Sequence, residues 1–393
     1  MNAASSSSGR ILELDGLRAL AVLAVISFHY TVGNPLANPV TGLGWVGVDL
    51  FFVLSGYLIT SILVAARPPR ASTAVAGQPR PRYFSTFYAR RTLRIFPIYY
   101  LLLLVYFLAA RIGGGPQPWT YWLMHAAYLS SSLEFFHYWA FAAPTFVYAG
   151  VTVLWSLSIE EQFYLMWAPV VRYLPPRRLW MVLAGAVVGA PVLRFFIHTA
   201  GHAEYRFLPA RFDALAWGAV LALVWTHWNR DGRAAIRYRR VMLGAGAGLA
   251  LLIALTGGTR GSHWFATLGY TALAVFFAGV VGWTVARAGT ASPAARLLRW
   301  GPGRYVGRIS YTIYLVHYPV YMLVGAAGNG WLGAGWWGTA ARGLISVAVA
   351  IAVAGASWRF LESPILRLKD RWAPSPRWNR EPQPVLGRIV EAG

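Results

Sequence analysis

The stretch LDGLRALAVLAVISFHY, residues 14–30, is a nearly continuous apolar run. Continued to position 32, it approaches the roughly 20 residues that an α-helix needs to cross the hydrocarbon core of a membrane. Similar runs recur along the chain at residues 44–66, 95–110, 155–174, 179–197, 209–228, 241–256, 265–286, 305–326 and 338–360. The sequence therefore predicts an all-α polytopic membrane bundle of about ten transmembrane helices.

The composition of the chain supports this fold class. Hydrophobic residues make up 57% of the chain and charged residues only 12%, whereas a soluble domain usually contains about 25% charged residues. No polar block between the apolar runs is long enough for a second domain, so we expect one membrane domain over residues 14–362. A cytoplasmic N-terminal tail at residues 1–13 and a basic cytoplasmic C-terminal tail at residues 363–393 would flank it.

Basic residues fall mainly in the loops between the apolar runs. The net charge of +22 comes from 35 Lys and Arg against 13 Asp and Glu, and positively charged loops mark the cytoplasmic side of a membrane protein. An eleventh span at residues 119–133 would put the later basic loops outside, so we predict an interfacial or re-entrant segment there. With ten spans and both termini inside, the cytoplasmic loops are residues 67–94, 172–178, 230–240 and 287–308.

Charge and composition also narrow the partners and the location of the protein. Loop arginines offer a cationic surface to an anionic cofactor or to membrane lipids, and we expect no nucleic-acid partner. The chain contains no cysteine, which excludes disulfides, a thiol nucleophile and thiolate metal ligands. The polar start, residues 1–10, is not followed by a signal-peptide cleavage pattern. The Ala-, Arg- and Gly-rich composition suggests a bacterial genome and hence the bacterial cytoplasmic membrane.

Ionisable residues in the first predicted span are candidates for function. Such residues cost roughly 2.5–3.5 kcal/mol each on insertion scales, so each needs a physical reason. Asp15, Arg18 and His29 share this span. Arg18 and His29 lie eleven positions apart, almost three helical turns, so they share a face about 16 Å apart along the axis. The histidine is either a structural hydrogen bonder or a catalyst, and the arginine could also snorkel to the interface.

Acidic residues stand at the outer ends of two further predicted spans. GVDLFFVLSGYLIT contains Asp49, either a catalytic partner or a helix cap, and Gly56, which we expect to permit close helix packing. WSLSIEEQFYL contains the adjacent carboxylates Glu160 and Glu161. Two neighbouring acids that enter a membrane are difficult to explain structurally, so we favour a functional role for them.

Arginines precede or open two other predicted spans. In FYARRTLRIFPIYY, three of them form the arginine cluster (Arg90, Arg91 and Arg94) before a proline. Arg90 and Arg94 are four residues apart and should face one way. The cluster is either a positive-inside anchor or a phosphate cradle, since guanidinium groups match phosphate oxygens. In PARFDALAWG, Arg211 and Asp213 could form an internal ion pair.

The last two predicted spans carry the remaining polar candidates. GRISYTIYLVHYP contains Ser310 and His317, and the histidine is either a core hydrogen bonder or a substrate contact. WRFLESP leaves Glu362 close to the cytoplasmic face. We expect this glutamate to pair with a loop arginine rather than to act in catalysis.

Taken in order, these motifs resemble the acyltransferase family 3 membrane proteins. The resemblance rests on Arg18 and His29 at their spacing, FFVLSGYLI, RRTLRIFP, WSLSIEEQFYL, RFDAL and SYTIYLVHYP, and it runs from Leu14 to about Leu366. It implies a membrane O-acyltransferase that moves an acyl group, commonly acetyl, from cytoplasmic acyl-CoA to a hydroxyl group. Acceptors in the family are sugars, surface polysaccharides, peptidoglycan and metabolites such as macrolides. The resemblance implies no metal.

The functional residues of that family carry over onto matching positions. His29 and Arg18 match its essential histidine and arginine, and the arginine cluster matches its conserved basic motif. Glu160 matches the glutamate of its WSLSxE motif, whereas Glu161 lies where the family varies more. Many relatives add an extracytoplasmic hydrolase-like domain, and only about thirty residues follow the last predicted span here. We therefore expect the chain to complete the transfer itself or to pass the acyl group to a separate protein.

These residues suggest a mechanism for acyl transfer. His29 would deprotonate the acceptor hydroxyl and be oriented by Glu160, while the arginine cluster holds the acyl-CoA phosphates. The pantetheine arm would run along the Arg18 face. Because no cysteine is present, we favour direct transfer, although an acyl-histidine stays open. Substrate binding or structural support is expected from Asp15, Asp49, Glu161, Arg211, Asp213, Ser310 and His317.

Two questions stay open from the sequence alone. The main rival function is a transporter or flippase of an anionic or lipid-linked substrate, because such proteins also hold charges within the membrane. The acceptor could be a glycosylated metabolite such as a macrolide, which we slightly favour on the compact length of the chain, or a cell-envelope glycan. The oligomeric state is not predicted.

Overall fold

The computed structural model describes residues 11–67, 82–113, 118–135, 145–200, 204–229, 232–257, 261–328, 332–333 and 335–372. Every regular element in these ranges is helical. Most of the two predicted tails, residues 1–10 and 373–393, lies outside the described ranges.

Ten helices of 17 residues or more form the described part of the bundle. Each coincides with one of the ten apolar runs. They are α1 (Glu13–Thr31), α3 (Gly47–Ala65), α4 (Tyr83–Gly113), α8 (Leu154–Tyr173), α9 (Pro176–Thr199), α10 (Leu208–Trp228), α11 (Ala234–Thr256), α12 (Tyr270–Ala286), α15 (Ser310–Gly328) and α16 (Trp336–Ser357). The largest difference from the sequence prediction is α4, which begins at Tyr83 and has 31 residues, so that the arginine cluster lies inside the helix.

Eight stretches of the described chain are long and apolar enough to cross a membrane. The two long helices outside this group are α8 and α15, which carry polar residues such as Glu160, Glu161 and His317. Because helices are one of the two structures that satisfy their backbone polar groups within lipid, the chain is an all-α, multi-pass membrane protein. The exact number of spans and the sides of the two termini stay predictions.

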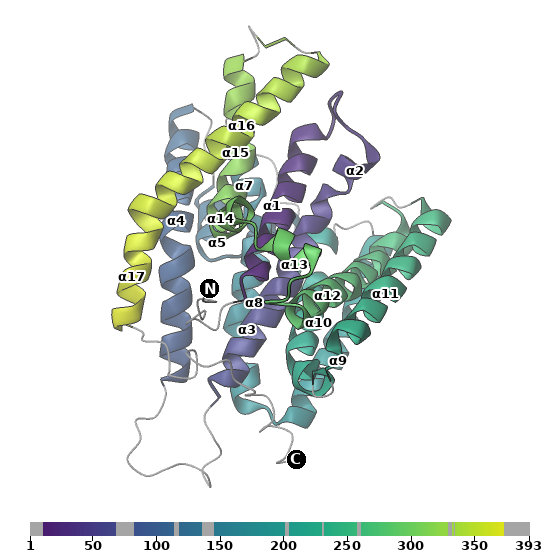
Figure 1. Cartoon of the computed structure of the whole chain (residues 1–393). Helices are drawn as coiled ribbons and strands as arrows, with labels where there is room; N and C mark the ends of the chain where they lie inside the picture. Colours follow the sequence, from purple (N-terminus) through teal and green to yellow (C-terminus); the bar gives the residue numbers. More distant parts are fainter. Residues whose placement is uncertain are drawn as a thin grey trace, which may run out of the picture.

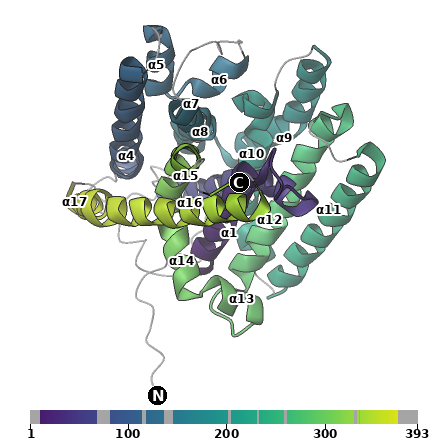
Figure 2. The same ribbon diagram turned by 90° about the horizontal axis from the view of Figure 1, so that it is seen from above.

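Two groups of helices flank a central set. Figure 1 shows α1, α3 and α8 in the middle, α9 to α12 on one side, and α4, α15 and α16 on the other. The view from above in Figure 2 separates α4 and α11 to opposite edges. The main contacts pair α3 with α10, α11 with α12, and α15 with α16. In addition, α1 contacts α12 in one group and α15 in the other, so the central helices touch both groups.

Glycine permits the close crossing of α3 and α10, as the sequence predicts for Gly56. A methyl group on Gly56 would collide with the backbone carbonyl oxygen of Leu215. A methyl group on Gly218 would collide with the carbonyl oxygen of Val53. The two backbones touch without side chains between them, which is the usual function of small residues at helix contacts in membranes.

The segment at residues 119–133 forms short helices. They are α5 (Trp119–Ala126) and α6 (Ser130–Phe135), and Tyr128 between them has a positive φ of 55°. A third short helix, α7 (Thr145–Thr152), precedes α8. Tyr99 of α4 donates a hydrogen bond to the carbonyl oxygen of His125 at 2.7 Å, and burial lowers the pKa of this histidine to about 4. Neither α5 nor α6 is long enough to span a membrane, in keeping with an interfacial or re-entrant segment.

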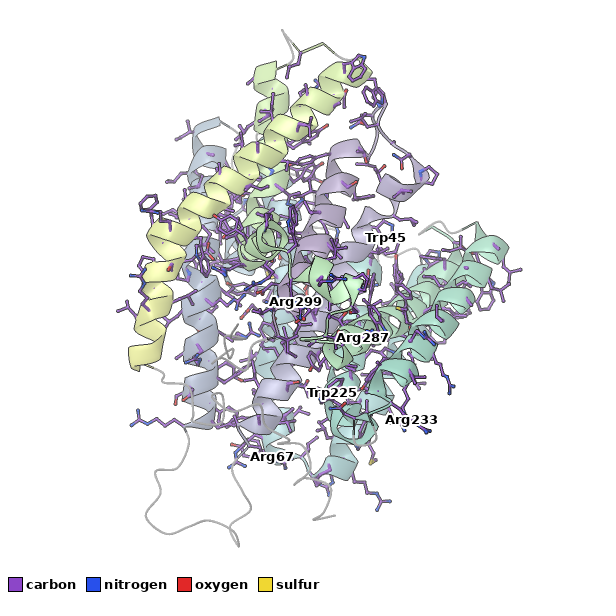
Figure 3. The ribbon with its side chains drawn as sticks, viewed as in Figure 1. Trp45, Arg67, Trp225, Arg233, Arg287 and Arg299 are labelled. Carbon is purple, nitrogen blue, oxygen red and sulfur yellow. The ribbon has the colours of Figure 1, made fainter. Side chains whose placement is uncertain are left out.

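Short helices also form in the loop before α15. The loop contains α13 (Pro293–Leu298) and α14 (Gly301–Arg308), so the run predicted from 305 is interrupted at Ile309. Arg299 donates to the Glu13 carboxylate at 3.1 Å and joins this loop to the start of α1. Figure 3 labels Arg299 beside this junction, and it places Arg67 and Arg233, from two other basic loops, toward the lower end of the bundle.

The last helix extends past the boundary predicted for the membrane domain. After α16, a turn of π-helix at Trp358–Glu362 leads without a break into α17 (Ser363–Trp372). Residue 362 is therefore inside a continuous helical stretch. Its side chain, Glu362, accepts hydrogen bonds from Thr312 at 2.6 Å and Ser357 at 2.9 Å. The expected pairing with a loop arginine is wrong, because Glu362 forms no ion pair among the described residues and its Oε1 atom accepts from these two hydroxyl groups instead.

Candidate functional site

A cavity opens in the middle of the bundle, between α1, α3, α4, α8 and α15. It contains about 790 Å³ of space between atoms, including its mouth. Its walls combine three arginines, two glutamates, several hydroxyl groups and apolar side chains. The lining residues are Arg18, Val48, Phe51, Phe52, Ser55, Leu58, Arg91, Arg94, Ile95, Ser156, Leu157, Glu160, Glu161, Tyr164, Ser310, Tyr311 and Tyr314. Six residues singled out in the sequence line this cavity, whereas His29 and His317 are not among its lining residues: the six are Arg18, Arg91, Arg94, Glu160, Glu161 and Ser310.

The cationic wall of the cavity comes from α1 and α4. Arg18 lies 3.5 Å from the Asp15 carboxylate, one turn earlier on α1. Arg91 and Arg94 line the cavity from α4, whereas Arg90 is not among the lining residues. The guanidinium carbon of Arg91 lies 4.6 Å from the centre of the Tyr164 ring. The two arginines that face the cavity together are therefore three residues apart, and not the pair four residues apart that the sequence suggested.

The two adjacent acids of α8 line the same cavity but have different surroundings. Glu160 accepts hydrogen bonds from Ser55 at 2.7 Å and from Tyr164 at 3.0 Å. Glu161 has one buried carboxylate oxygen that receives no hydrogen bond from any described residue. Arg91 interacts electrostatically with both acids. The Glu160 carboxylate is thus held by hydrogen bonds from the protein, while one oxygen of the Glu161 carboxylate receives none from the described residues.

Hydroxyl groups occupy the wall formed by α8 and α15. The hydroxyls of Ser156 and Tyr314 are 2.6 Å apart. Tyr311 donates to the carbonyl oxygen of Ile95 at 2.9 Å, which ties α15 to α4. Ser310, predicted as a supporting residue, lines the cavity beside it. The sequence analysis did not single out Tyr314 as a site residue, although it stands in the same motif one turn before His317.

His29 and His317 form a pair just beyond Tyr314. The Nε2 atom of His317 lies 3.1 Å from Nδ1 of His29. Nδ1 of His317 is 2.7 Å from the carbonyl oxygen of Tyr314, and Nδ1 of His29 is 2.9 Å from that of Val25. Since a carbonyl oxygen only accepts hydrogen bonds, both Nδ1 atoms carry protons. The basic lone pair of His29 is then on Nε2.

The pairing of these two histidines differs from the sequence-based expectation. We expected Glu160 to orient His29, but Glu160 bonds to Ser55 and Tyr164, and His29 bonds to His317. Tyr30 also donates to the carbonyl oxygen of His317 at 2.7 Å. A signal was present in the sequence, because each residue is a histidine within an apolar run, His29 toward the outer end of its predicted span and His317 in the middle of its span.

A second polar cluster lies fully buried between α3, α9, α10 and α12. Arg211 forms an ion pair with Asp49. Arg194 forms two hydrogen bonds to Asp213, at 2.9 and 3.1 Å, and Thr271 donates to the same carboxylate at 2.5 Å. All four charged side chains have no exposed surface. The cluster links four helices through matched charges, which is how charge is usually tolerated inside a membrane.

The expected ion pair between Arg211 and Asp213 is therefore wrong. Residues two positions apart on a helix point about 200° apart, because each residue turns the chain by about 100°. Arg211 consequently faces Asp49 on α3, and Asp213 faces Arg194 on α9. Arg194 was not singled out in the sequence, although it is an arginine within an apolar run. Asp49 is a structural partner in this arrangement and does not line the cavity.

The site combines the groups that acyl transfer requires. Cations and the hydroxyl pair of Ser156 and Tyr314 line the cavity, and the histidine pair lies next to Tyr314. Within the described ranges, no group of three or more His, Cys, Asp or Glu side chains converges as metal ligands do. The geometry suits the binding of an anionic ligand and proton transfer by an imidazole.

Comparisons with known proteins agree with this reading. The family model described as an acyltransferase domain matches residues 11–359. The chain is 27% identical over 378 residues to a peptidoglycan O-acetyltransferase, OatA, of Listeria monocytogenes serovar 1/2a, and 31% identical over 374 residues to a putative peptidoglycan O-acetyltransferase, YrhL, of Bacillus subtilis. It is 26% identical over 379 residues to the O-acetyltransferase OatA of Staphylococcus aureus.

Each of these alignments covers 90% of this chain but only 54% to 56% of the relative. The chain thus spans about half the length of the relatives it matches. No solved structure is significantly similar to it. The family model nevertheless extends over nearly all of the membrane bundle, from the start of α1 to the end of α16, and includes every residue that lines the cavity. The chain therefore belongs to acyltransferase family 3.

Proposed function

We propose that this protein transfers an acyl group, in the first instance acetyl, from acyl-CoA to a hydroxyl group of a cell-envelope glycan. Family membership supports the reaction class, and the names of the relatives support peptidoglycan or a related glycan as the acceptor. The observation that carries the proposal is the cavity. Its charged walls lead to Tyr314, whose backbone oxygen holds His317 beside His29.

In this proposal the donor enters the cavity from the cytoplasmic side. Guanidinium groups bind phosphates through paired hydrogen bonds, and Arg94 offers such a group in the cavity wall. The basic loops add a positive potential that attracts an anionic carrier.

His29 is the proposed general base, and His317 is its positioning residue. With its proton on Nδ1, His29 donates toward His317 and Val25 and keeps a lone pair on Nε2. A base whose second nitrogen is held in this way has a fixed tautomer and orientation, as in Ser-His-Asp triads. A second histidine takes the position that the carboxylate occupies in those triads.

The proposed reaction is a single displacement. The acceptor hydroxyl oxygen attacks the thioester carbonyl carbon as Nε2 of His29 takes its proton. The C–S bond then breaks, and the thiolate of CoA takes up the proton from His29. The Ser156 and Tyr314 hydroxyls, which share one short hydrogen bond, can direct a second O–H group toward the oxyanion that forms during attack.

The test of this function is an assay on purified protein in detergent. Incubation with radiolabelled acetyl-CoA and peptidoglycan oligosaccharides should transfer label to the glycan, and His29→Ala should abolish transfer without altering the yield of folded protein. A parallel reaction with a macrolide tests the metabolite acceptor. Label on wild-type protein after denaturation, in the absence of acceptor, would contradict the single displacement.

The same assay separates the enzyme from a transporter. A transporter or flippase needs a sealed membrane and forms no acetylated product, so product in detergent solution supports the enzyme. If His29→Ala retains wild-type transfer, the assigned base is wrong. If neither glycan nor macrolide is acetylated by protein that binds acetyl-CoA, both acceptor classes are excluded. The donor assignment would still stand in that case.

A further inference from the structure

The cavity contains a carboxylate oxygen that has no hydrogen-bond donor. Glu160 has two hydroxyl donors, whereas the buried Oε1 atom of Glu161 has none among the described residues. Buried polar groups in folded proteins are nearly always hydrogen-bonded, because a buried group without a partner has lost its hydrogen bonds to water and gained none in return. Since Glu161 lines the cavity, a ligand in the cavity can supply the missing donor.

Arg91 stands in the same part of the cavity as this carboxylate. Its guanidinium stacks on Tyr164, and it forms no ion pair with Glu160 or Glu161 among the described residues. It still interacts electrostatically with both acids. The cavity wall thus presents hydrogen-bond donors on Arg91 beside an acceptor on Glu161. A ligand group that complements both must itself carry one acceptor and one donor.

The two acids argue against a phosphate at Arg91. A phosphate there would lie beside two carboxylates, and like charges repel strongly where water is scarce. A neutral secondary amide fits the same two groups, because its carbonyl oxygen accepts from a guanidinium and its N–H donates to a carboxylate. Both acids interact electrostatically with Arg91. Arg94, three residues further along α4, also lines the cavity and is the second guanidinium on this helix that can bind a phosphate there.

We propose that Glu161 and Arg91 together bind one of the two amide groups of the pantetheine arm of the donor. This inference rests on the proposed function, since it assumes that the donor is a CoA thioester. It divides the arginines between two tasks, with Arg94 binding phosphate and Arg91 binding the neutral arm. The amide clamp, Glu161 with Arg91, then fixes how far the thioester reaches toward Tyr314 and His317.

The test measures ligand affinity for the full chain in detergent by titration calorimetry. Glu161→Gln should weaken CoA binding about 3- to 10-fold, because a charged acceptor becomes a neutral one. Glu161→Leu should weaken it further. Adenosine 3′,5′-bisphosphate, which has phosphates but no arm, should bind both variants at least as well as wild type. If Glu161 acted only through its negative charge, its removal in Glu161→Gln would favour the anionic ligand, and the variant would bind CoA more tightly than wild type.

Analogues of CoA methylated at one or the other amide nitrogen identify the contact. One of them should bind wild type about 3- to 10-fold more weakly than CoA, and this loss should largely vanish in Glu161→Leu. The amide clamp is overturned if properly folded Glu161→Gln and Glu161→Leu bind CoA as wild type does. It is also overturned if, for both analogues, the loss of affinity from methylation and the loss from Glu161→Leu simply add. In either case the donor assignment stands. If wild type binds neither CoA nor the bisphosphate, the donor assignment fails, and the amide clamp with it.

Discussion

At the residue scale, His29 owes its proposed function to the groups on its Nδ1 edge. Hydrogen bonds to Val25 and His317 hold the ring from that side, while His317 is held in turn by Tyr314. His317 itself is fully buried. A buried histidine that accepts one hydrogen bond and donates another is fixed in one tautomer, so its main effect is on the orientation of its neighbour.

The function of His317 as a positioning residue can be measured. His317→Phe should lower kcat at least about 10-fold, because a positioned base contributes about 10²- to 10⁴-fold, while KM for acetyl-CoA changes little. His317→Gln should recover part of the rate, since its side-chain oxygen can still accept from Nδ1 of His29. Steady-state kinetics and thermal unfolding of both variants provide the measurement. Equal rate losses in the two variants, in step with lower unfolding temperatures, would indicate a structural role alone.

Candidate residues were predictable from the sequence one by one, but their pairing was not. His29, Arg18 and Glu160 were identified because each is an ionisable residue within an apolar run, where such residues are costly in a membrane. The sequence did not separate Glu160, which has hydroxyl partners, from Glu161, which retains an unused acceptor. Adjacent residues on a helix point about 100° apart, so their surroundings depend on which helices stand on each side.

At the element scale, the crossing of α3 and α10 depends on glycine. A methyl group on Gly56 would meet the backbone of Leu215, which cannot move aside as a flexible side chain would. The same two helices carry Asp49 and Arg211, whose ion pair needs the helices at this separation. A change in the crossing would therefore also disturb the buried charges.

Substitution of Gly56 should thus be far more harmful than substitution of a glycine that faces open space. We expect Gly56→Ala to destabilise the protein by about 1–3 kcal/mol, the usual cost of overpacking. Gly185→Ala on α9 is the matched control, because nothing lies within 4 Å of its added methyl group. Thermal unfolding followed by size-exclusion chromatography compares them. Similar unfolding temperatures for the two variants would contradict the close crossing.

At the scale of the whole molecule, the predicted topology puts the His29 end outside and the basic loops inside. The chain contains no cysteine, so single cysteines can report accessibility without background. Ala37, between α1 and α3, and Ala291, before α13, are both exposed. A membrane-impermeant maleimide should label Ala37→Cys but not Ala291→Cys in intact cells, and both after lysis. Labelling of Ala291→Cys alone in intact cells would reverse the assigned orientation.

The amino-acid sequence by itself determined that this is a helical membrane protein, where its long helices lie, and to which family it belongs. The first two properties are local, because the transfer of a helix into lipid depends on the residues of that helix. The family follows from motifs that are likewise present in the sequence itself. Only the tertiary structure decided that Asp49 binds Arg211, that His29 binds His317, and that Arg91 rather than Arg90 faces the cavity. Those choices depend on how each helix is rotated and which neighbour it meets, and neither is encoded in the hydropathy of a single segment.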